Sequence, residues 1–398
     1  MSILTSVPLA PRDPILGLTE QFVSDPRPDK VNLGVGVYLG EDGRIPLLDC
    51  VKVAEARLAA TPAPRGYLPI DGLAAYNTGV KQLVFGATAE PVLSGRVVTV
   101  QGLGGTGALK VGAEFLKVTS ARATVLISDP SWENHQALFS RAGFDVQSYR
   151  YYNRALGGID IDGMLADLAA AAPGTIVVLH ACCHNPTGYD LSAGQWQQVA
   201  SIVVERGLVP FLDLAYQGFS EGIEPDGAVV ARFAALGVPM LVASSFSKSF
   251  SLYGERVGGL SVVAGDAEEA SRVLSQLKVT IRTTYSSPPT HGASVVSTVL
   301  GDAELRAGWA SELEAMRLRI RAMRTALVAG LVAAGSSVDM GFIADQVGMF
   351  SYCGLSAAQM TELRTAHGVY GTDAGRICVA ALNQGNVARV ASAIAAVL

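Results

Sequence analysis

The sequence predicts an α/β protein in which helices cover both faces of a central sheet. Short runs rich in β-branched residues alternate with longer segments compatible with helices, a pattern typical of βαβ units. Hydrophobic residues make up 49% of the chain and charged residues only 16%, which indicates a large buried core. The runs with the strand pattern are 96–101, 124–128, 175–180, 209–213, 240–244 and 258–263.

The pattern changes after about residue 300, where apolar residues recur at intervals of three and four. This spacing predicts a long amphipathic helix. Its apolar stripe contains Leu313, Met316, Ile320, Met323 and Leu327. A segment at 347–353, a strand-like stretch at 376–380 and a terminal helix from about residue 383 follow. A length of 398 residues suits about two domains, so we expect a large domain at 40–300 and a small domain from 1–39 plus 301–398.

The charge distribution excludes several classes of partner. The net charge is −5, and Lys and Arg are nowhere concentrated as a nucleic-acid-binding surface requires. No run reaches the roughly 18 apolar residues of a membrane span, and the first residues lack the features of a secretory signal. Five cysteines are an odd and sparse set, unlike a disulfide framework. We therefore expect a cytoplasmic protein with reduced thiols.

A glycine-rich segment, GLGGTG, follows the first predicted strand. Gly102, Gly104 and Gly107 satisfy the G-x-G-x-x-G spacing of dinucleotide sites, and Asp129 lies downstream where a ribose ligand is expected. A nicotinamide-dependent oxidoreductase is therefore an alternative. Against it, glycine-rich turns before helices suit any phosphate, and nearly a hundred residues precede this one.

Two further motifs point to other chemistries. Ser245 and Lys248 form the S-x-x-K pair of acyl-transferring serine enzymes, but the S-D-N and K-T-G partners are absent from the sequence.

Several possible metal ligands lie close together at 180–184. A strand there would put His180 and Cys182 on one face and Cys183 on the other, so they cannot converge easily. We expect buried thiols and a hydrogen-bonded histidine at a strand end, with no metal.

Lys248 is the strongest candidate for chemistry taken by itself. It follows an apolar strand and is flanked by small hydroxyl residues and phenylalanines. Burial and a nearby cation, for which Arg256 is available, would lower the pKa of such an amine and make it nucleophilic toward aldehydes. The alternative is a surface lysine in a loop.

Taken together, a set of ordered motifs resembles one known family, the fold-type I aminotransferases that use pyridoxal 5′-phosphate, subgroup Iα. The motifs are DPIL from Asp13, NLGVGVY from Asn32, GGTGAL from Gly104, PSWENH from Pro130, CCHNPTG from Cys182, DLAYQGF from Asp213, SFSK from Ser245, YSSPP from Tyr285 and GR from Gly375. The resemblance covers nearly the whole chain. It implies a large domain with a mostly parallel seven-stranded sheet, a smaller α+β domain, and a homodimer with shared active sites.

The resemblance also implies roles for the residues near the cofactor ring. Lys248 matches the lysine that forms a Schiff base and then acts as a general base. Asp213 matches the carboxylate that bonds the pyridine nitrogen, Tyr216 and Asn185 match the partners of the 3′ oxygen, and Trp132 matches the stacked ring. Alone, these residues would suit a helix cap, turns and packed aromatics.

Phosphate binding is implied for a second group of residues. A cup of backbone amides, hydroxyls and one arginine suits a group with about two negative charges. The matching residues are Gly105, Thr106, Gly107, Ser245, Ser247 and Arg256, with Tyr67 reaching in from the neighbouring subunit.

Two arginines match the substrate-binding groups of the family. Arg376 matches the clamp on the α-carboxylate, with the Gly36 region closing over that end, and Arg282 matches the residue from the other subunit that binds a distal carboxylate. Surface salt bridges are the alternative for both. Asp373 departs from the small or apolar residues of the family, and we expect it to point to solvent without affecting binding.

The predicted function is transamination by a ping-pong cycle. The segments at 132–135, 249–260 and 348–352 look more like bacterial aromatic aminotransferases than strict aspartate enzymes. We therefore expect tyrosine and phenylalanine, together with aspartate or glutamate, as donors and 2-oxoglutarate or another 2-oxo acid as acceptor. An aspartate transaminase with little aromatic activity is the closest alternative.

Overall fold

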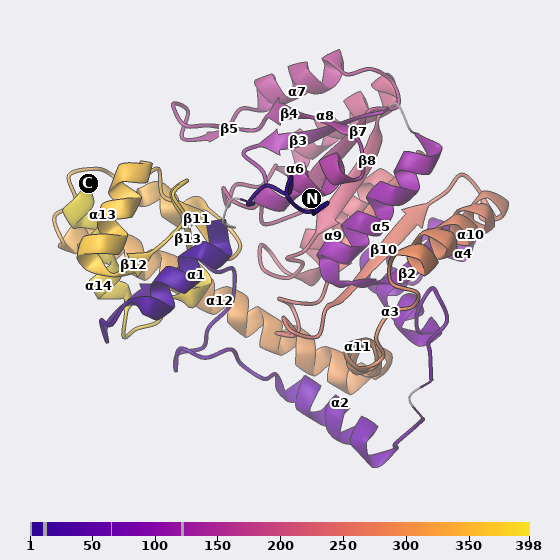
Figure 1. Ribbon diagram of the computed structural model, residues 1–398, viewed down its shortest axis with the longest axis horizontal. Coiled ribbons are helices and arrows are strands. Elements are labelled where there is room, and N and C mark those ends of the chain that lie inside the picture. Colours follow the sequence, from indigo (N-terminus) through magenta and orange to yellow (C-terminus); the bar gives the residue numbers. More distant parts are fainter. Residues whose placement is uncertain (1, 11–13, 65, 121–122) are drawn as a thin grey trace.

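The computed structural model describes residues 2–10, 14–64, 66–120 and 123–398, arranged as a large and a small lobe (Figure 1). Asp13, which opens the first motif, lies outside these ranges. Within them, a seven-stranded sheet forms the large lobe, and only β10 runs antiparallel to its neighbours. In spatial order the strands are β2 (Val97–Leu103), β10 (Val257–Val263), β9 (Met240–Ser245), β8 (Val209–Leu214), β7 (Ile176–His180), β3 (Thr124–Asp129) and β4 (Asp145–Arg150). The predicted fold class is confirmed.

Helices cover both faces of this sheet. One face packs against α5 (Gly104–Thr119), α6 (Glu133–Arg141) and α10 (Ala267–Thr284). The other face packs against α3 (Ala74–Phe85), α7 (Ile161–Ala170), α8 (Ala193–Arg206) and α9 (Ile223–Ala234). The remaining elements of this lobe are α2 (Asp49–Ala60), α4 (Glu90–Leu93), β5 (Tyr152–Asn153), β6 (Gly158–Ile159) and α11 (His291–Gly301).

All six predicted strands are present, and their ends differ from the prediction by a few residues. The sequence does not predict the edge strand β4. Of its side chains, only Tyr149 is buried, while Asp145, Gln147 and Arg150 face solvent, so no apolar run marks it. Charged and polar side chains are common on edge strands, because they discourage pairing of the open edge with another chain.

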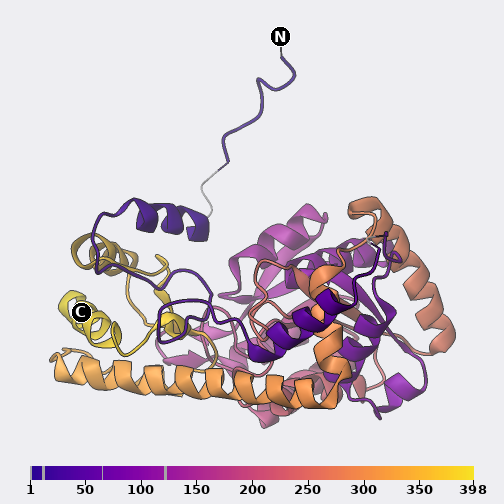
Figure 2. The same cartoon turned by 90° about the horizontal axis from the view of Figure 1, so that it is seen from below.

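The predicted amphipathic helix is α12 (Ala303–Ala333), which runs along both lobes (Figure 2). The side chain of Asp302 caps it by accepting the backbone N–H groups of Glu304 and Leu305. All five residues of the predicted apolar stripe are buried. The helix therefore provides a continuous apolar surface on which both lobes pack.

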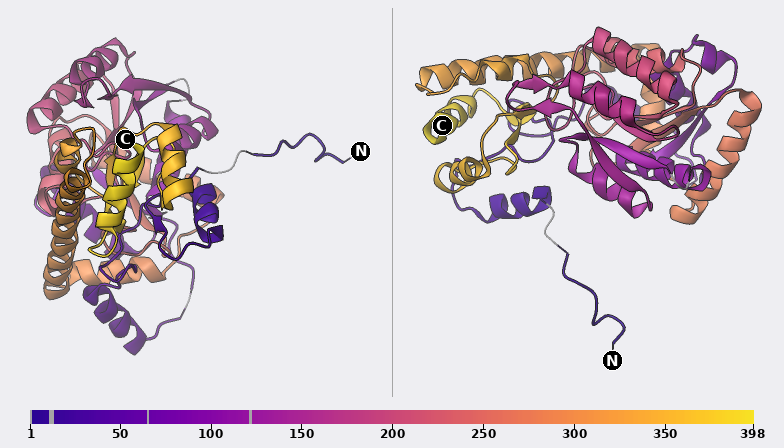
Figure 3. Two further views of the ribbon diagram at one scale, coloured as in Figure 1. Left: turned by 90° about the vertical axis from the view of Figure 1, so that its left-hand side faces the viewer. Right: turned by 90° about the horizontal axis from the view of Figure 1, so that it is seen from above.

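The small lobe brings together segments from the beginning and the end of the chain (Figure 3). Its elements are α1 (Pro14–Ser24), β1 (Val31–Asn32), η1 (Gly341–Asp345), β11 (Phe350–Tyr352), α13 (Ala357–His367), β12 (Val369–Tyr370), β13 (Arg376–Cys378), η2 (Val379–Ala381) and α14 (Val387–Val397). β1 pairs in parallel with β12, and β11 pairs antiparallel with β13. The strand-like stretch predicted at 376–380 is shorter than expected, because η2 begins at Val379. The domain borders at 39/40 and 300/301 stay a prediction.

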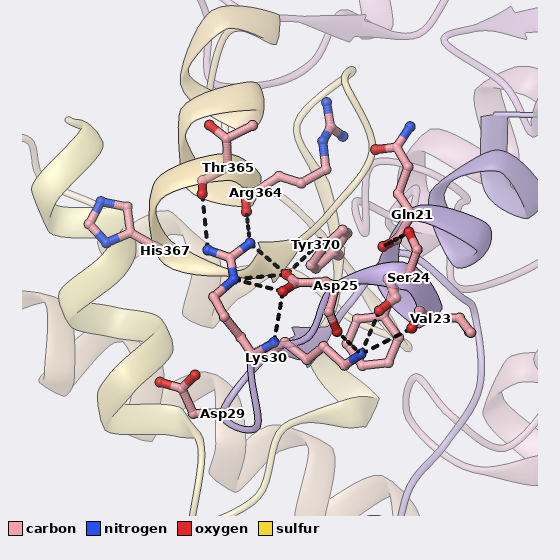
Figure 4. A network of polar contacts seen from close by, with 12 residues as sticks. Gln21, Val23, Ser24, Asp25, Asp29, Lys30, Arg364, Thr365, His367 and Tyr370 are labelled. Atoms are coloured by element: carbon pink, nitrogen blue, oxygen red, sulfur yellow. Dashed lines mark hydrogen bonds and ion pairs between the residues drawn. The ribbon is translucent and has the colours of Figure 1, made fainter.

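A polar network fastens the segment after α1 to helix α13 (Figure 4). Arg27 donates to both carboxylate oxygens of Asp25 and to the carbonyls of Arg364 and Thr365, at 2.9 and 3.0 Å. The Arg27 hydrogen bonds hold the pKa of Asp25 well below its ordinary value. Lys30 donates to the carbonyl of Phe22 at 2.7 Å. The end of α1 is thus held against α13 within the small lobe.

Candidate active site

A cavity of about 230 Å³ lies at the carboxyl ends of β7, β8 and β9. This is where ligands bind in open α/β sheets. Twelve of the predicted site residues line it: Gly36, Gly105, Thr106, Trp132, Asn185, Asp213, Tyr216, Ser245, Ser247, Lys248, Arg256 and Arg376. The cavity is also lined by Ile15, Leu109, His180, Ala215, Tyr253 and Phe350, which the sequence does not assign to it.

One end of the cavity is built to hold an anion. Helix α5 begins there at Gly104, which adopts a φ of +69° and whose added Cβ would lie 2.6 Å from Nη2 of Arg256. A Cβ on Gly105 would lie 3.1 Å from Cβ of Ser245. The guanidinium of Arg256 donates to Oγ of Ser247 at 3.4 Å and to the carbonyl of Tyr253 at 2.9 Å. Glycines, hydroxyls, a helix N-terminus and one arginine together fit a phosphate.

Gly107 does not line this cavity. A Cβ at that position would lie 2.8 Å from Cβ of Leu103, so the glycine permits the close turn from β2 into α5. Its predicted contact with the phosphate stays a prediction.

Asp213 lies at the end of β8 and is buried. Its Oδ2 is 3.0 Å from Nε2 of His135, whose Nδ1 is 2.9 Å from Oγ of Ser131. Burial raises the pKa of Asp213, but the hydrogen bond from His135 and the nearby His180 and Lys248 outweigh this and lower it. The sequence analysis missed His135, although its spacing of four from Ser131 across the start of a helix was a usable signal.

Lys248 follows β9 and faces the same space. Its Nζ lies 4.7 Å from the ring centre of Tyr216, which is itself buried. Burial lowers the pKa of Lys248 to about 8; Asp213 opposes this shift and Arg256 adds to it. The amine therefore lies in a cavity near the negative charge of Asp213 and the positive charge of Arg256. The alternative of a surface lysine is not supported.

Trp132 is the residue directly before α6, and it lines the cavity. Its ring meets His135 edge to face, with ring centres 5.3 Å apart. The aromatic face is thereby fixed relative to the Asp213–His135 pair.

Arg376 enters from β13 in the small lobe and is 3% exposed. Nη1 donates to Oδ1 of Asn185 at 3.1 Å, and Nη2 donates to the carbonyl of Gly34 at 2.9 Å. The guanidinium lies 4.4 Å from the ring centre of Phe350. A Cβ on Gly36 would lie 2.6 Å from the same ring, so glycine allows the N-terminal segment to approach it. Residues from both lobes thus meet at this end of the cavity.

Asp373 points away from Arg376, as expected. Its carboxylate accepts a hydrogen bond from Arg364 at 3.0 Å, and 67% of its side chain is exposed. The carboxylate that does approach Arg376 is Glu133, whose Oε1 lies 3.7 Å from Nη1. Glu133 belongs to the PSWENH motif, but the sequence assigns it no role.

Two buried carboxylates hold the loops that carry Asn185 and Tyr216. Asp190 accepts the backbone N–H groups of Cys183 at 2.7 Å and His184 at 2.9 Å. Asp226 accepts that of Ser220 at 3.0 Å, and the Ser220 hydroxyl donates to Asp190 at 3.2 Å. Burial raises the pKa of both carboxyl groups, while the donating amides oppose the shift. The two loops are thereby joined through one serine.

The prediction for the cluster at 180–184 is partly wrong. Within the described ranges, neither ring nitrogen of the buried His180 has a hydrogen-bond partner, because its neighbours are the rings of His135 and His184. Strand β7 ends at His180, so the strand alternation assumed for Cys182 and Cys183 does not apply. The expectation of buried thiols is confirmed, since all five cysteines are free and buried.

The ligand atoms of His135, His180 and Asp213 lie within 4.8 Å of one another, as do those of Cys182, Cys183 and Asp226. In the first group, His135 already binds Asp213. In the second, Asp226 accepts three backbone N–H groups. The carboxylate of each group is therefore already hydrogen-bonded to protein donors.

Tyr67 and Arg282 lie outside the cavity. They line a separate hollow of about 290 Å³ together with Ser286. Tyr67 is 97% exposed, and Nη1 of Arg282 donates to Oγ of Ser286 at 2.6 Å. A single chain therefore does not bring them to Lys248.

The arrangement is that of an α/β enzyme with an anion cup and a nucleophilic amine in one cavity. A family model, Aminotransferase class I and II, matches residues 28–394, and the chain belongs to this family. The predicted class of pyridoxal-phosphate-dependent aminotransferase is confirmed. A nicotinamide-dependent oxidoreductase receives no support.

Individual relatives agree with this placement. The chain is 58% identical over its whole length to the full aspartate aminotransferase of Pseudomonas aeruginosa. It is 53% identical to the aromatic-amino-acid aminotransferase of Escherichia coli, covering 97% of this chain and 98% of that protein. The crystal structure of an aromatic-amino-acid aminotransferase from Burkholderia pseudomallei, covalently bound to pyridoxal phosphate, matches with a TM-score of 0.98 and 60% identity over all of both chains.

Proposed function

We propose that this aminotransferase transfers the amino group of phenylalanine, tyrosine and aspartate or glutamate to 2-oxoglutarate or another 2-oxo acid by a ping-pong cycle. The observation that carries the proposal is the amine of Lys248 in one cavity with Asp213, Tyr216 and the anion cup. Relatives with aromatic and with aspartate names are similarly close, which supports a range that includes both substrate types.

Pyridoxal phosphate, when bound, supplies an aldehyde that takes up the amino group and a ring that withdraws electrons from the substrate α-carbon. Its phosphate would be held by Gly105, Thr106, Ser245, Ser247 and Arg256. The absence of Cβ atoms on Gly104 and Gly105 leaves the space beside Arg256 and Ser245 that such a group needs.

The other cofactor contacts follow from the charges in the cavity. Asp213 would keep a proton on the pyridine nitrogen, because its own lowered pKa keeps it ionised at neutral pH. Tyr216 and Asn185 would donate to the ring oxygen, and Trp132 would cover one face of the ring. His135 orients Asp213 through their hydrogen bond of 3.0 Å.

Lys248 is the proposed proton carrier. Its Nζ would take the proton from the substrate α-carbon and return it on the cofactor side. A pKa of about 8, set by burial, keeps an appreciable fraction of this amine neutral at physiological pH, as a general base requires.

Arg376 is the proposed binding group for the substrate α-carboxylate. Its guanidinium is oriented by Asn185 and by the carbonyl of Gly34, and Nε has no hydrogen-bond partner within the described residues. A buried guanidinium with an unused donor suits a carboxylate ligand. Gly36 lines the same end of the cavity, next to Phe350.

We further propose a homodimer with shared active sites. Exposed Tyr67 and Arg282 share one hollow, as expected if both serve the partner's cavity. Residues 2–10 extend away from both lobes and expose Ile3 and Leu9 almost completely (Figures 2 and 3). An extended apolar arm of this kind is stabilised by a second subunit.

Mixing Lys248→Ala and Arg282→Ala chains tests the shared site, because each hybrid dimer would contain one intact site. Failure of this complementation would contradict the shared site.

A cytoplasmic location is also proposed, with five free cysteines in support. Separately, no helix in the described part of the chain combines the length and apolar character needed to cross a bilayer. Localisation of the tagged protein by cell fractionation tests the proposal.

The decisive experiment for the function is a visible absorption spectrum of the purified holoenzyme. Phenylalanine and aspartate are added to separate samples without any 2-oxo acid, and the bleaching rate of the cofactor band is followed. Bleaching by both donors supports the proposed range. Bleaching by aspartate alone would favour the aspartate transaminase, and no bleaching by any donor would overturn the proposal.

A further inference from the structure

Glu133 lies beside the proposed substrate arginine, Arg376. It is the first residue of α6 and follows Trp132 directly. Its Oε1 is 3.7 Å from Nη1 of Arg376. The side chain of Glu133 is 39% exposed, whereas that of Arg376 is 3% exposed. A carboxylate with access to solvent thus faces a buried guanidinium.

The contact is electrostatic and leaves the guanidinium available. A separation of 3.7 Å exceeds the length of a hydrogen bond, so Glu133 does not occupy a donor of Arg376. The donors in use are those that bind Asn185 and Gly34, and Nε has no partner within the described residues. Among those same residues, this is the one ion pair that Arg376 makes.

A buried positive charge is costly unless an opposite charge balances it. When no substrate is present, Glu133 provides that balance. The N-terminus of α6 also favours a negative charge at its first residue. An incoming substrate carboxylate brings the same charge to the same arginine, and like charges repel.

We propose that Glu133 balances the charge of Arg376 until the substrate α-carboxylate binds. It thereby sets the affinity of this enzyme for carboxylate ligands. The inference rests on the proposed role of Arg376. Glu133 acts through Arg376 and is a positioning and affinity-determining residue, not a catalytic one. It balances Arg376 in the free enzyme and opposes ligand binding, so removing its charge tightens the binding of carboxylates.

The test compares the holoenzyme with its Glu133→Gln variant, which keeps the shape of the side chain and removes the charge. The probe is 3-phenylpropionate, which has the ring and carboxylate of phenylalanine but no amino group. Its dissociation constant is measured by isothermal titration calorimetry, independently of turnover. A partly exposed ion pair is typically worth a factor of about two to five, so we expect a dissociation constant lower by about twofold to fivefold. The KM for phenylalanine should fall similarly, with kcat nearly unchanged.

Glu268→Gln is the matched control, because Glu268 is also in the first turn of a helix and pairs with an arginine, Arg272, at the surface. It should leave the dissociation constant unchanged. Unchanged or weaker binding of the probe by Glu133→Gln would overturn the inference, as would a wild-type enzyme that does not bind the probe. Transamination by the wild type is scored separately by bleaching, so failure of the proposed function is distinguishable from failure of this inference.

Discussion

Substitution of Gly104 by alanine tests the anion cup directly. The residue has a φ of +69°, where a side chain costs about 1 kcal/mol, and the new Cβ would lie 2.6 Å from Nη2 of Arg256. The guanidinium must therefore move away from the cup. A hydrogen bond to a charged group is worth about 1.5–3 kcal/mol, so its loss should weaken binding of pyridoxal phosphate by about tenfold to a hundredfold.

Gly157→Ala provides the matched control for this substitution. Gly157 has a φ of +64°, but nothing lies within 4 Å of its added Cβ. Both variants should lose about 1 kcal/mol of unfolding free energy in urea, because both place a side chain in the left-handed region. Only Gly104→Ala should bind the cofactor weakly when the apoenzyme is titrated and the visible band is recorded. Cofactor affinity within twofold of the wild type would refute the assignment of the cup.

Four further predictions concern the proposed active site. Lys248→Ala should retain the cofactor without a covalent bond and lose turnover by several orders of magnitude in single-turnover assays; normal turnover would remove Lys248 from the mechanism. Arg282→Ala should raise the KM for aspartate far more than that for phenylalanine, and equal increases would show that it does not bind the distal carboxylate. His135→Asn removes the hydrogen bond that lowers the pKa of Asp213, so this pKa should rise and the acid limb of the kcat/KM profile should move to higher pH; an unmoved limb would contradict the pairing. Because burial lowers the pKa of Lys248 to about 8, covalent uptake of cofactor by the apoenzyme should accelerate from pH 7 and level off above pH 9, whereas a rate that continues to climb toward pH 10.5 would indicate an unperturbed amine.

Much of the cavity could be predicted because its residues lie in turns that follow apolar strands. Asp213 is the last residue but one of β8, Ser245 ends β9 with Lys248 shortly after it, and Gly104 follows β2. In a mostly parallel sheet the carboxyl ends of the strands meet at one edge, so local patterns are sufficient to bring these residues together. The edge strand β4 was missed for the opposite reason, since it buries too few side chains to leave a pattern.

The partners of the charged groups could not be predicted in this way. The sequence analysis considered Asp373, a near neighbour of Arg376 in the chain, but that carboxylate pairs with Arg364. Glu133, from the other lobe, is the carboxylate that approaches Arg376. Likewise, His135 lies on α6, which follows β3, and binds Asp213 near the end of β8.

The sequence by itself therefore determined the fold class, the family and the lysine on which the chemistry depends, because periodicity and short motifs indicate all three. The tertiary structure alone decided which charges balance one another and how deeply each is buried. Electrostatic interactions and desolvation change over a few ångströms, and residue spacing along the chain does not encode such distances.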